Sequence, residues 1–223
     1  MRKLIMFIVL MSSSLLTLAQ SAADFNYSIG VRAYSIMQLP KILNQINSRD
    51  YTNTYGNGIL VKFNDNQISY RIGGTYFSDN VSFTNTCATC EIASGKVTDY
   101  SFKIGFEKTF TYSRVQPYFA FDLGYRFNRF NGDLKPAGES FNSKNANVTK
   151  NGLVLAPVIG VKVNIIPQLT LFAESNMDFY FLYEKQDIMA PDGDSRTVNK
   201  YNRLECLLNP ISAGLHFNIS RRN

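Results

Sequence analysis

Residues 119–128 read FAFDLGYRFN, in which large apolar residues alternate strictly with small, charged or amide residues. Successive side chains of a β-strand point to opposite faces, so strict alternation predicts a strand with one apolar and one polar face. Phe119, Leu123 and Phe127 would share the apolar face, and Asp122 and Arg126 the polar one.

The same alternation recurs along the whole chain, with no helical period between the repeats, so we expect an all-β protein. Two prolines should disturb strands, Pro157 through a bulge and Pro210 through a bend. Tyr34 is placed on the polar face of the first strand, beside Arg32. Eight strands are predicted, at residues 25–36, 57–64, 66–78, 97–110, 116–130, 152–165, 168–182 and 203–219.

The connections between these strands alternate in length. Short turns are expected at 64–66, 111–115 and 166–168, and long polar loops at 38–56, 79–96, 131–150 and 183–201. All long loops would then lie at one end of the sheet. An even strand count with this layout predicts an eight-stranded antiparallel up-and-down transmembrane β-barrel whose short turns face the periplasm.

Alternation alone leaves open whether the apolar face points outward to lipid or inward, as in a secreted lipocalin-like cup. Glycine favours the outward orientation, because a glycine on a solvated exterior would pack nothing, whereas in a crowded lumen it makes room. An eight-stranded barrel has an interior just wide enough for side chains, so rows of Phe and Tyr fit better outside. Six glycines lie on the polar face: Gly30, Gly73, Gly105, Gly124, Gly160 and Gly214.

The first 22 residues are predicted to be a cleaved export signal, which leaves residues 23–223 as the barrel domain. Arg2 and Lys3 precede the apolar run from Leu4, and several small residues offer cleavage sites before Ala23. Cleavage between residues 19 and 23 is expected. A retained anchor is the alternative, but Ser12 interrupts the run well short of the ~20 residues that a spanning helix needs.

The rest of the chain limits the other ways of associating with a membrane or a partner. No Cys lies near the cleavage site for lipidation, and no later stretch approaches ~18 uncharged apolar residues. Without Arg2 and Lys3, 21 of the 23 basic residues remain against 17 acidic ones. Because the charges are interspersed, no nucleic-acid partner is expected.

From Phe25 to Ile219 the chain resembles the small eight-stranded outer-membrane β-barrels of the OmpA and OmpX kind. The resemblance implies a Gram-negative outer-membrane location, contact with outer-membrane lipid, and no chemical activity in particular. Barrels of this kind end on an aromatic residue that the assembly machinery recognises. Here Phe217 is followed by six further residues, which is a departure from that pattern.

The predicted lumen collects six basic and four acidic side chains. Confined opposite charges should pair, because an unpaired buried ion costs far more than a paired one, and a charge-paired plug is expected. The alternative is a narrow or gated pore that favours anions, supported only by the basic excess. The residues are Arg32, Lys62, Arg71, Lys103, Glu107, Asp122, Arg126, Lys162, Glu174 and Asp178.

Two further groups could carry chemistry. Ser212 and His216 share one face of the last strand, as in a lipid-modifying hydrolase, but no carboxylate is placed to orient the imidazole. Cys87 and Cys90 form a CxxC in the second long loop, where export to an oxidising compartment favours a local disulfide. Cys206 would be buried at the rim or available for an intermolecular bond. Neither a cofactor nor a metal site is expected.

The long loops are where binding to an extracellular or envelope protein would reside, because exposed loops on a rigid scaffold usually carry function. Asn53, Tyr55 and Asn57 belong to the first loop, and residues 135–150 to the third. Asp192 and Asp194 in the fourth could hold a cation but are expected to form a solvated turn. The predicted function is therefore structural or loop-mediated binding, with a narrow channel as the alternative and a lipid-modifying enzyme after it.

Overall fold

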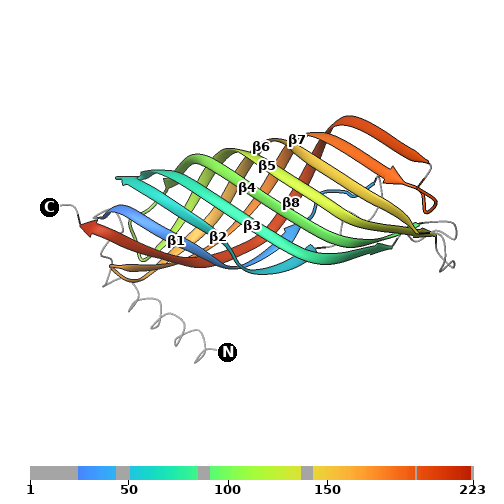
Figure 1. The fold of residues 1–223 in the computed structure, drawn as a ribbon. Helices are drawn as coiled ribbons and strands as arrows, with labels where there is room; N and C mark the ends of the chain where they lie inside the picture. Colours follow the sequence, from blue (N-terminus) through green and yellow to red (C-terminus); the bar gives the residue numbers. More distant parts are fainter. Residues whose placement is uncertain (1–24, 44–50, 85–90, 137–142, 194, 222–223) are drawn as a thin grey trace, which may run out of the picture.

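The structure is a computed structural model that describes residues 25–43, 51–84, 91–136, 143–193 and 195–221. Each strand pairs with the next and β8 pairs with β1, which closes an antiparallel barrel (Figure 1). This confirms the predicted fold class. The strands are β1 (Phe25–Gln38), β2 (Tyr51–Asp65), β3 (Ile68–Thr84), β4 (Glu91–Thr109), β5 (Val115–Pro136), β6 (Lys144–Ile166), β7 (Leu169–Met189) and β8 (Arg196–Arg221). The described residues include no helix that is long and apolar enough to cross a membrane.

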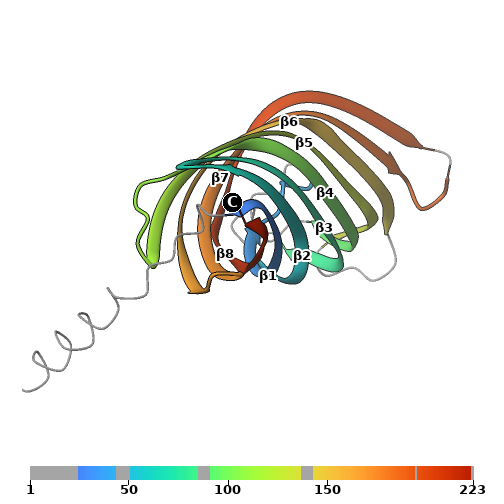
Figure 2. The ribbon, with the colours of Figure 1, turned by 90° about the vertical axis from the view of Figure 1, so that its left-hand side faces the viewer.

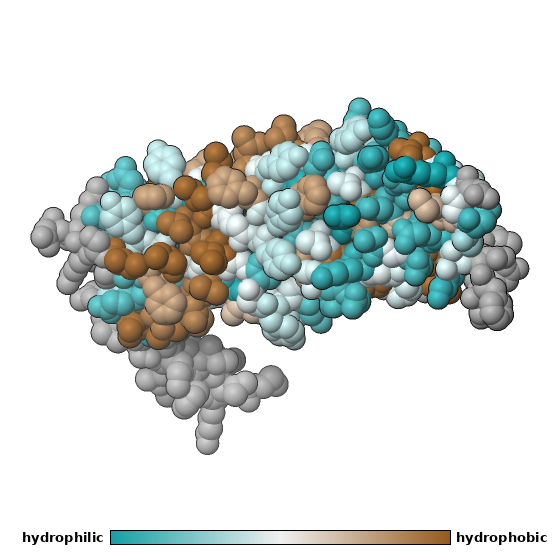
Figure 3. Space-filling view, in the orientation of Figure 1, coloured by the Kyte–Doolittle hydropathy of each residue, from teal (hydrophilic) through white to brown (hydrophobic). Residues whose placement is uncertain are grey.

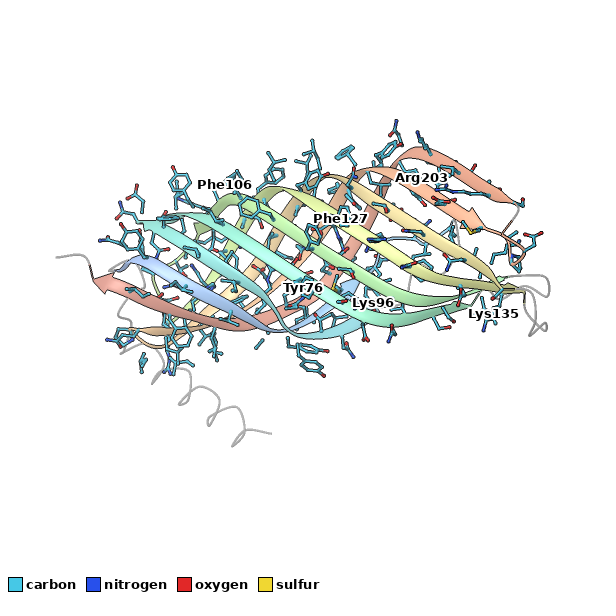
Figure 4. All side chains as sticks on the ribbon, in the orientation of Figure 1. Tyr76, Lys96, Phe106, Phe127, Lys135 and Arg203 are labelled. Carbon is cyan, nitrogen blue, oxygen red and sulfur yellow. The ribbon has the colours of Figure 1, made fainter. Side chains whose placement is uncertain are left out.

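The predicted faces of the central strands are also confirmed. Tyr70 and Phe102 point outward and are 61% and 56% exposed, whereas Arg71 and Asp122 are buried inside. Apolar side chains gather on the outer surface over the short-turn end, apolar and polar ones mix over the middle of the barrel, and polar ones cover most of the long-loop end (Figure 3). In Figure 4 the ring of Phe106 points away from the barrel and belongs to this apolar surface. We call this apolar surface the outer belt.

The strands extend much further toward the long-loop end than the alternation predicted. Most residues expected in the long loops continue the sheet, including those of β3 up to Thr84 and those of β5 up to Pro136. The reason is that the polarity inverts beyond the outer belt: Ala93 and Leu134 point inward, whereas Ser94 and Lys135 are exposed outside. A search for apolar outer faces misses a strand of this kind.

Beyond the outer belt the barrel is open on one side. β2 pairs with β3 only as far as Gly58 and Thr75, and β1 pairs with β8 only as far as Ile36 and Ile211. The remaining parts of β3 to β8 form a curved wall, and the β7–β8 hairpin reaches past the ring of strands (Figure 2). We call this part the projecting wall.

Two local predictions are wrong. The register of β1 shifts between Arg32 and Tyr34, which turns Tyr34 outward against Tyr55 instead of placing it on the polar face. Pro157 produces no register shift. It lies where β6 lacks partners on β7, because proline has no N–H to donate. The register of β7 and β8 does shift opposite Pro210, where a bend was predicted.

The glycines on the inner face make room as expected. A Cβ on Gly160 would lie 2.4 Å from the Tyr118 ring, and one on Gly30 would lie 2.3 Å from His216 Nδ1. Both neighbours are large side chains buried in the lumen. By contrast, Gly74 faces outward, and the nearest atom to its added Cβ is 3.9 Å away.

Candidate functional site

The interior of the barrel is the candidate site, and all ten charged residues predicted for it lie there. Nearest the short turns, the lumen is filled by amide and hydroxyl side chains. Ser28 donates a hydrogen bond to Asn218 at 2.8 Å, and Asn64 donates to Ser28 at 2.9 Å. The charged residues lie above this layer.

Glu107 is the centre of the first charged layer. Its carboxylate accepts hydrogen bonds from Lys62 and, at 2.6 Å, from Lys162, and Arg71 approaches it at 3.5 Å. Both lysine ammonium groups also lie 5.3 Å from the centroid of the Tyr118 ring. Three cations therefore surround one fully buried carboxylate.

Arg71 links this layer to the next. Its guanidinium lies 3.1 Å from Asp122 and 3.2 Å from Glu174. Glu174 is also paired with Arg32 at 2.6 Å and accepts a hydrogen bond from the Tyr118 hydroxyl at 2.9 Å. Arg71 thus contacts three carboxylates from three different strands and crosses the middle of the lumen.

A third layer joins Arg126 to two aspartates. Arg126 lies 2.9 Å from Asp99 and 3.4 Å from Asp178, and Lys103 is paired with Asp178 at 2.5 Å. Asp99 also accepts a hydrogen bond from Asn128 at 2.8 Å. The charge-paired arrangement expected from the sequence is therefore present in each layer.

The structure adds a fourth charged layer that the sequence analysis missed. Lys150, which was predicted to lie in an exposed loop, is fully buried and paired with Glu205 at 2.7 Å and with Glu184 at 3.6 Å. With Asp99, and with Arg203, which lies 3.8 Å from Glu184, these residues bring the described lumen pairs to eight basic and seven acidic side chains. The basic excess that supported an anion-favouring pore therefore falls from two side chains to one in the described lumen.

Above Lys150 the lumen is apolar and filled by the chain that follows β1. Leu39 and Ile42 are both 3% exposed and pack against residues of the projecting wall such as Phe130. Lys150 donates a hydrogen bond to the backbone carbonyl of Lys41, and the Lys41 backbone N–H donates to Glu205 at 3.1 Å. We call residues 39–43 the mouth segment. The whole cluster comprises Leu39, Ile42, Phe77, Ala93, Val97, Phe130, Leu134, Ala146 and Val148.

Little space remains between these layers. The cavity beside Arg126 and Lys103 has a volume of about 30 Å³, and the one near Asn64 and Lys162 about 20 Å³. A water molecule needs roughly 10–15 Å³ by the same measure, so each cavity has room for about one to three waters. Neither is large enough for a continuous aqueous path through the described lumen.

Ser212 and His216 do not form a catalytic pair in this arrangement. His216 is 2% exposed and stacks on Phe172 with ring centroids 4.3 Å apart. Neither ring nitrogen has a hydrogen-bond partner among the described residues. Ser212 instead lines the cavity beside Arg126.

The other predicted groups lie partly outside the described residues. Cys87, Cys90 and Asp194 are not among them, so the expected disulfide stays a prediction, as does the export signal. Cys206 is a free, exposed thiol on the outer face of β8 and is therefore not buried at a rim. The residues that the structure describes contain no cluster of three or more His, Cys, Asp or Glu side chains that could hold a metal ion.

The outer face of the projecting wall is polar and carries exposed basic side chains, among them Lys96 and Lys135 (Figure 4). Arg196 donates hydrogen bonds to Asp187, at 2.8 Å from Nε, and this holds the pKa of Asp187 below its usual value. Asn53, Tyr55 and Asn57, predicted to lie in a loop, belong to β2.

No protein-family model matches the chain, and no curated protein sequence is similar to it. Several solved structures match the chain, and two of them illustrate its fold. Neisserial surface protein A is 17% identical with a TM-score of 0.52, and 87% of this chain covers 97% of that protein. A major outer membrane protein from Thermus thermophilus is 12% identical with a TM-score of 0.53, and 86% of this chain covers 99% of it. The chain therefore has the fold of the small eight-stranded outer-membrane β-barrels.

Proposed function

We propose that the protein is an integral outer-membrane barrel of a Gram-negative bacterium that does not conduct, and that it holds the projecting wall outside the cell for binding a partner. The outer belt would contact lipid. A closed barrel satisfies its backbone hydrogen bonds internally, as the hydrocarbon core requires. The chain would reach this location through a cleaved export signal.

The observation that carries this proposal is the double closure of the lumen. Arg71, Glu107 and Glu174 close it within the outer belt, and Leu39 and Ile42 close it again beyond the belt. Two closures of different chemistry favour a barrel that anchors over one that transports. The nearly balanced charge of the described lumen pairs supports the same proposal.

The binding role rests on the projecting wall. An apolar cluster packs its interior, its outer face is polar and exposed, and the sequence of the adjoining connections is polar. Rigid scaffolds that present polar connections commonly bind partners through them. We propose an extracellular or envelope protein as this partner.

Conductance in planar bilayers tests the closure. The purified barrel should give no steady current, and heat-modifiable gel mobility should first show that the sample is folded. A large steady conductance that changes in Arg71→Gln or Lys103→Gln would identify a pore and contradict the proposal.

Cross-linking on intact cells tests the binding role. A membrane-impermeant, amine-reactive reagent should give heavier species that contain the protein. These species should decrease in a variant with Lys96→Arg and Lys135→Arg, which keeps the charge but lowers the amine reactivity. If no cross-linked species form in cells that display the protein, the binding role is wrong.

A further inference from the structure

The outer surface carries a slot where the outer belt meets the projecting wall. It is an open groove of about 610 Å³ that crosses β6, β7 and β8. Its floor is the backbone row of Gly152, Leu182 and Arg203, which are direct cross-strand partners. Since strands lie about 4.8 Å apart, three strands give the slot a length of roughly 10 Å.

The two walls of the slot differ in chemistry. The lower wall is the row Leu153, Phe181 and Leu204, whose side chains are 57%, 48% and 53% exposed. The upper wall is the neighbouring row Asn151, Tyr183 and Asn202. One side of the slot therefore suits hydrocarbon, and the other suits polar groups.

Two lysines lie one row beyond the upper wall. Lys185 and Lys200 are exposed and directly opposite each other on β7 and β8. Like charges in this position repel each other, so a bound anion would stabilise the pair. Asp187, two residues from Lys185, already has Arg196 as its partner.

The slot lies at the boundary where lipid headgroups are expected. Along β6 and β8 the outer face changes from leucine to asparagine within two residues, and along β7 it changes from Tyr183 to Lys185. Figure 4 places Arg203 at this end of the outer belt. Three kinds of group therefore follow one another along the outer face. The apolar row corresponds to the acyl chain of a lipid, the amide and phenol row to its ester groups, and the ammonium groups to its phosphate.

From this match in polarity and charge, we propose that the slot binds one phosphate-bearing lipid of the outer leaflet. An acyl chain lies against Leu153, Phe181 and Leu204. The phosphate lies between the ammonium groups of Lys185 and Lys200. The proposal rests on the membrane location given above, but it does not depend on the closed lumen or on a protein partner.

Native mass spectrometry of the barrel released from nanodiscs tests the proposal. The nanodiscs contain phosphatidylcholine and phosphatidylglycerol with identical acyl chains. The wild type should retain one phosphatidylglycerol in preference to phosphatidylcholine. A basic residue near a membrane surface contributes about 1 kcal/mol to binding of anionic lipid, so Lys185→Gln with Lys200→Gln removes about 2 kcal/mol and should lower this preference about thirtyfold.

Matched variants separate the slot from general charge. Lys96→Gln with Lys135→Gln removes the same charge elsewhere on the wall and should leave the preference unchanged. Leu153→Ala with Leu204→Ala should lower retention of both lipids. All positions are exposed, and gel mobility checks that each variant is folded.

The other outcomes overturn the proposal. If both lysine double variants lose the phosphatidylglycerol preference equally, the attraction is due to general charge and not to the slot. If the wild type forms a dimer that disappears in the leucine double variant, a second copy of the chain occupies the slot. A wild type that enters nanodiscs without lipid preference refutes the slot alone. A wild type that does not enter them refutes the membrane location.

Discussion

At the scale of single residues, the buried ion pairs give the sharpest expectation for stability. Glu107→Gln leaves Lys62, Lys162 and Arg71 without their shared carboxylate. Breaking a buried pair costs about 3–5 kcal/mol, so the free energy of unfolding should fall by about that amount. Urea unfolding in lipid vesicles, followed by Tyr fluorescence or gel mobility, measures this change.

The matched control is Asp187→Asn, which breaks the exposed pair with Arg196 and should have little effect because solvent screens such pairs. Similar losses in the two variants would show that the lumen pairs do not stabilise the barrel.

Glycine offers a second comparison at this scale. Gly160→Ala places a Cβ against the Tyr118 ring, whose hydroxyl is bonded to Glu174. Overpacking of this kind costs about 1–3 kcal/mol. Gly74→Ala faces outward, where the added Cβ meets no atom closer than 3.9 Å, and should be close to neutral or stabilising. The same unfolding measurement compares them, and a reversed order would contradict the crowded-lumen interpretation.

Strict alternation was sufficient to place the ten charged residues in the lumen. It predicts which face of the strand each side chain lies on, and this does not require knowing its ion-pair partner. Asp99 has the same parity as Lys103 and lies within the predicted strand 97–110, so the alternation could have found it. Glu184 has the same parity as Asp178, and extending the predicted strand 168–182 by two residues would have found it. Glu205 could not be placed in this way, because the register shift near Pro210 reverses the parity on β8. Tyr34 was misplaced for the same physical reason.

At the scale of elements, the mouth segment should be the least firmly held part of the described closure. It is anchored by Leu39, Ile42 and the backbone contacts of Lys41. Leu39→Asp with Ile42→Asp should release it, because two charges cannot remain in an apolar cluster. Hydrogen exchange measured by mass spectrometry should then rise by at least tenfold at residues 38–43.

Exchange within β5 should stay low in this variant, and conductance should stay absent, because the Arg71 layer lies below. Steady current in the variant would show that the mouth segment alone closes the lumen. Unchanged exchange would show that other contacts hold it.

Strand ends were the least predictable elements. The expected ends coincide with the edge of the outer belt, because the sequence criterion was an apolar outer face. Beyond it, apolar residues such as Ala93 and Leu134 still alternate with polar ones but face inward, as in a water-soluble barrel. A single strand therefore passes from lipid into water, and its apolar residues change from the outer face to the inner face once. On β3 this change occurs near residues 76–77.

At the scale of the whole molecule, the closed eight-stranded ring was predicted from the alternation of short and long connections. This alternation depends only on the order in which the strands are connected. What fills the mouth did not follow from the sequence, because residues 39–43 show no alternation and their burial depends on contacts with five other strands. Closure of the lumen is thus a tertiary property.

The position of the bilayer is the last whole-molecule expectation, and the chain suits its measurement because it contains no Trp. Phe102→Trp and Lys96→Trp both lie on the outer face of β4, six residues or roughly 20 Å apart along the strand. In vesicles with brominated acyl chains, Trp at 102 should be quenched strongly, because it lies in the apolar band of about 25 Å. Trp at 96 should be quenched little, because it stands in water on the projecting wall. Equal quenching at both positions would mean that the wall is immersed in lipid, and no quenching at either would mean that the outer belt does not contact lipid.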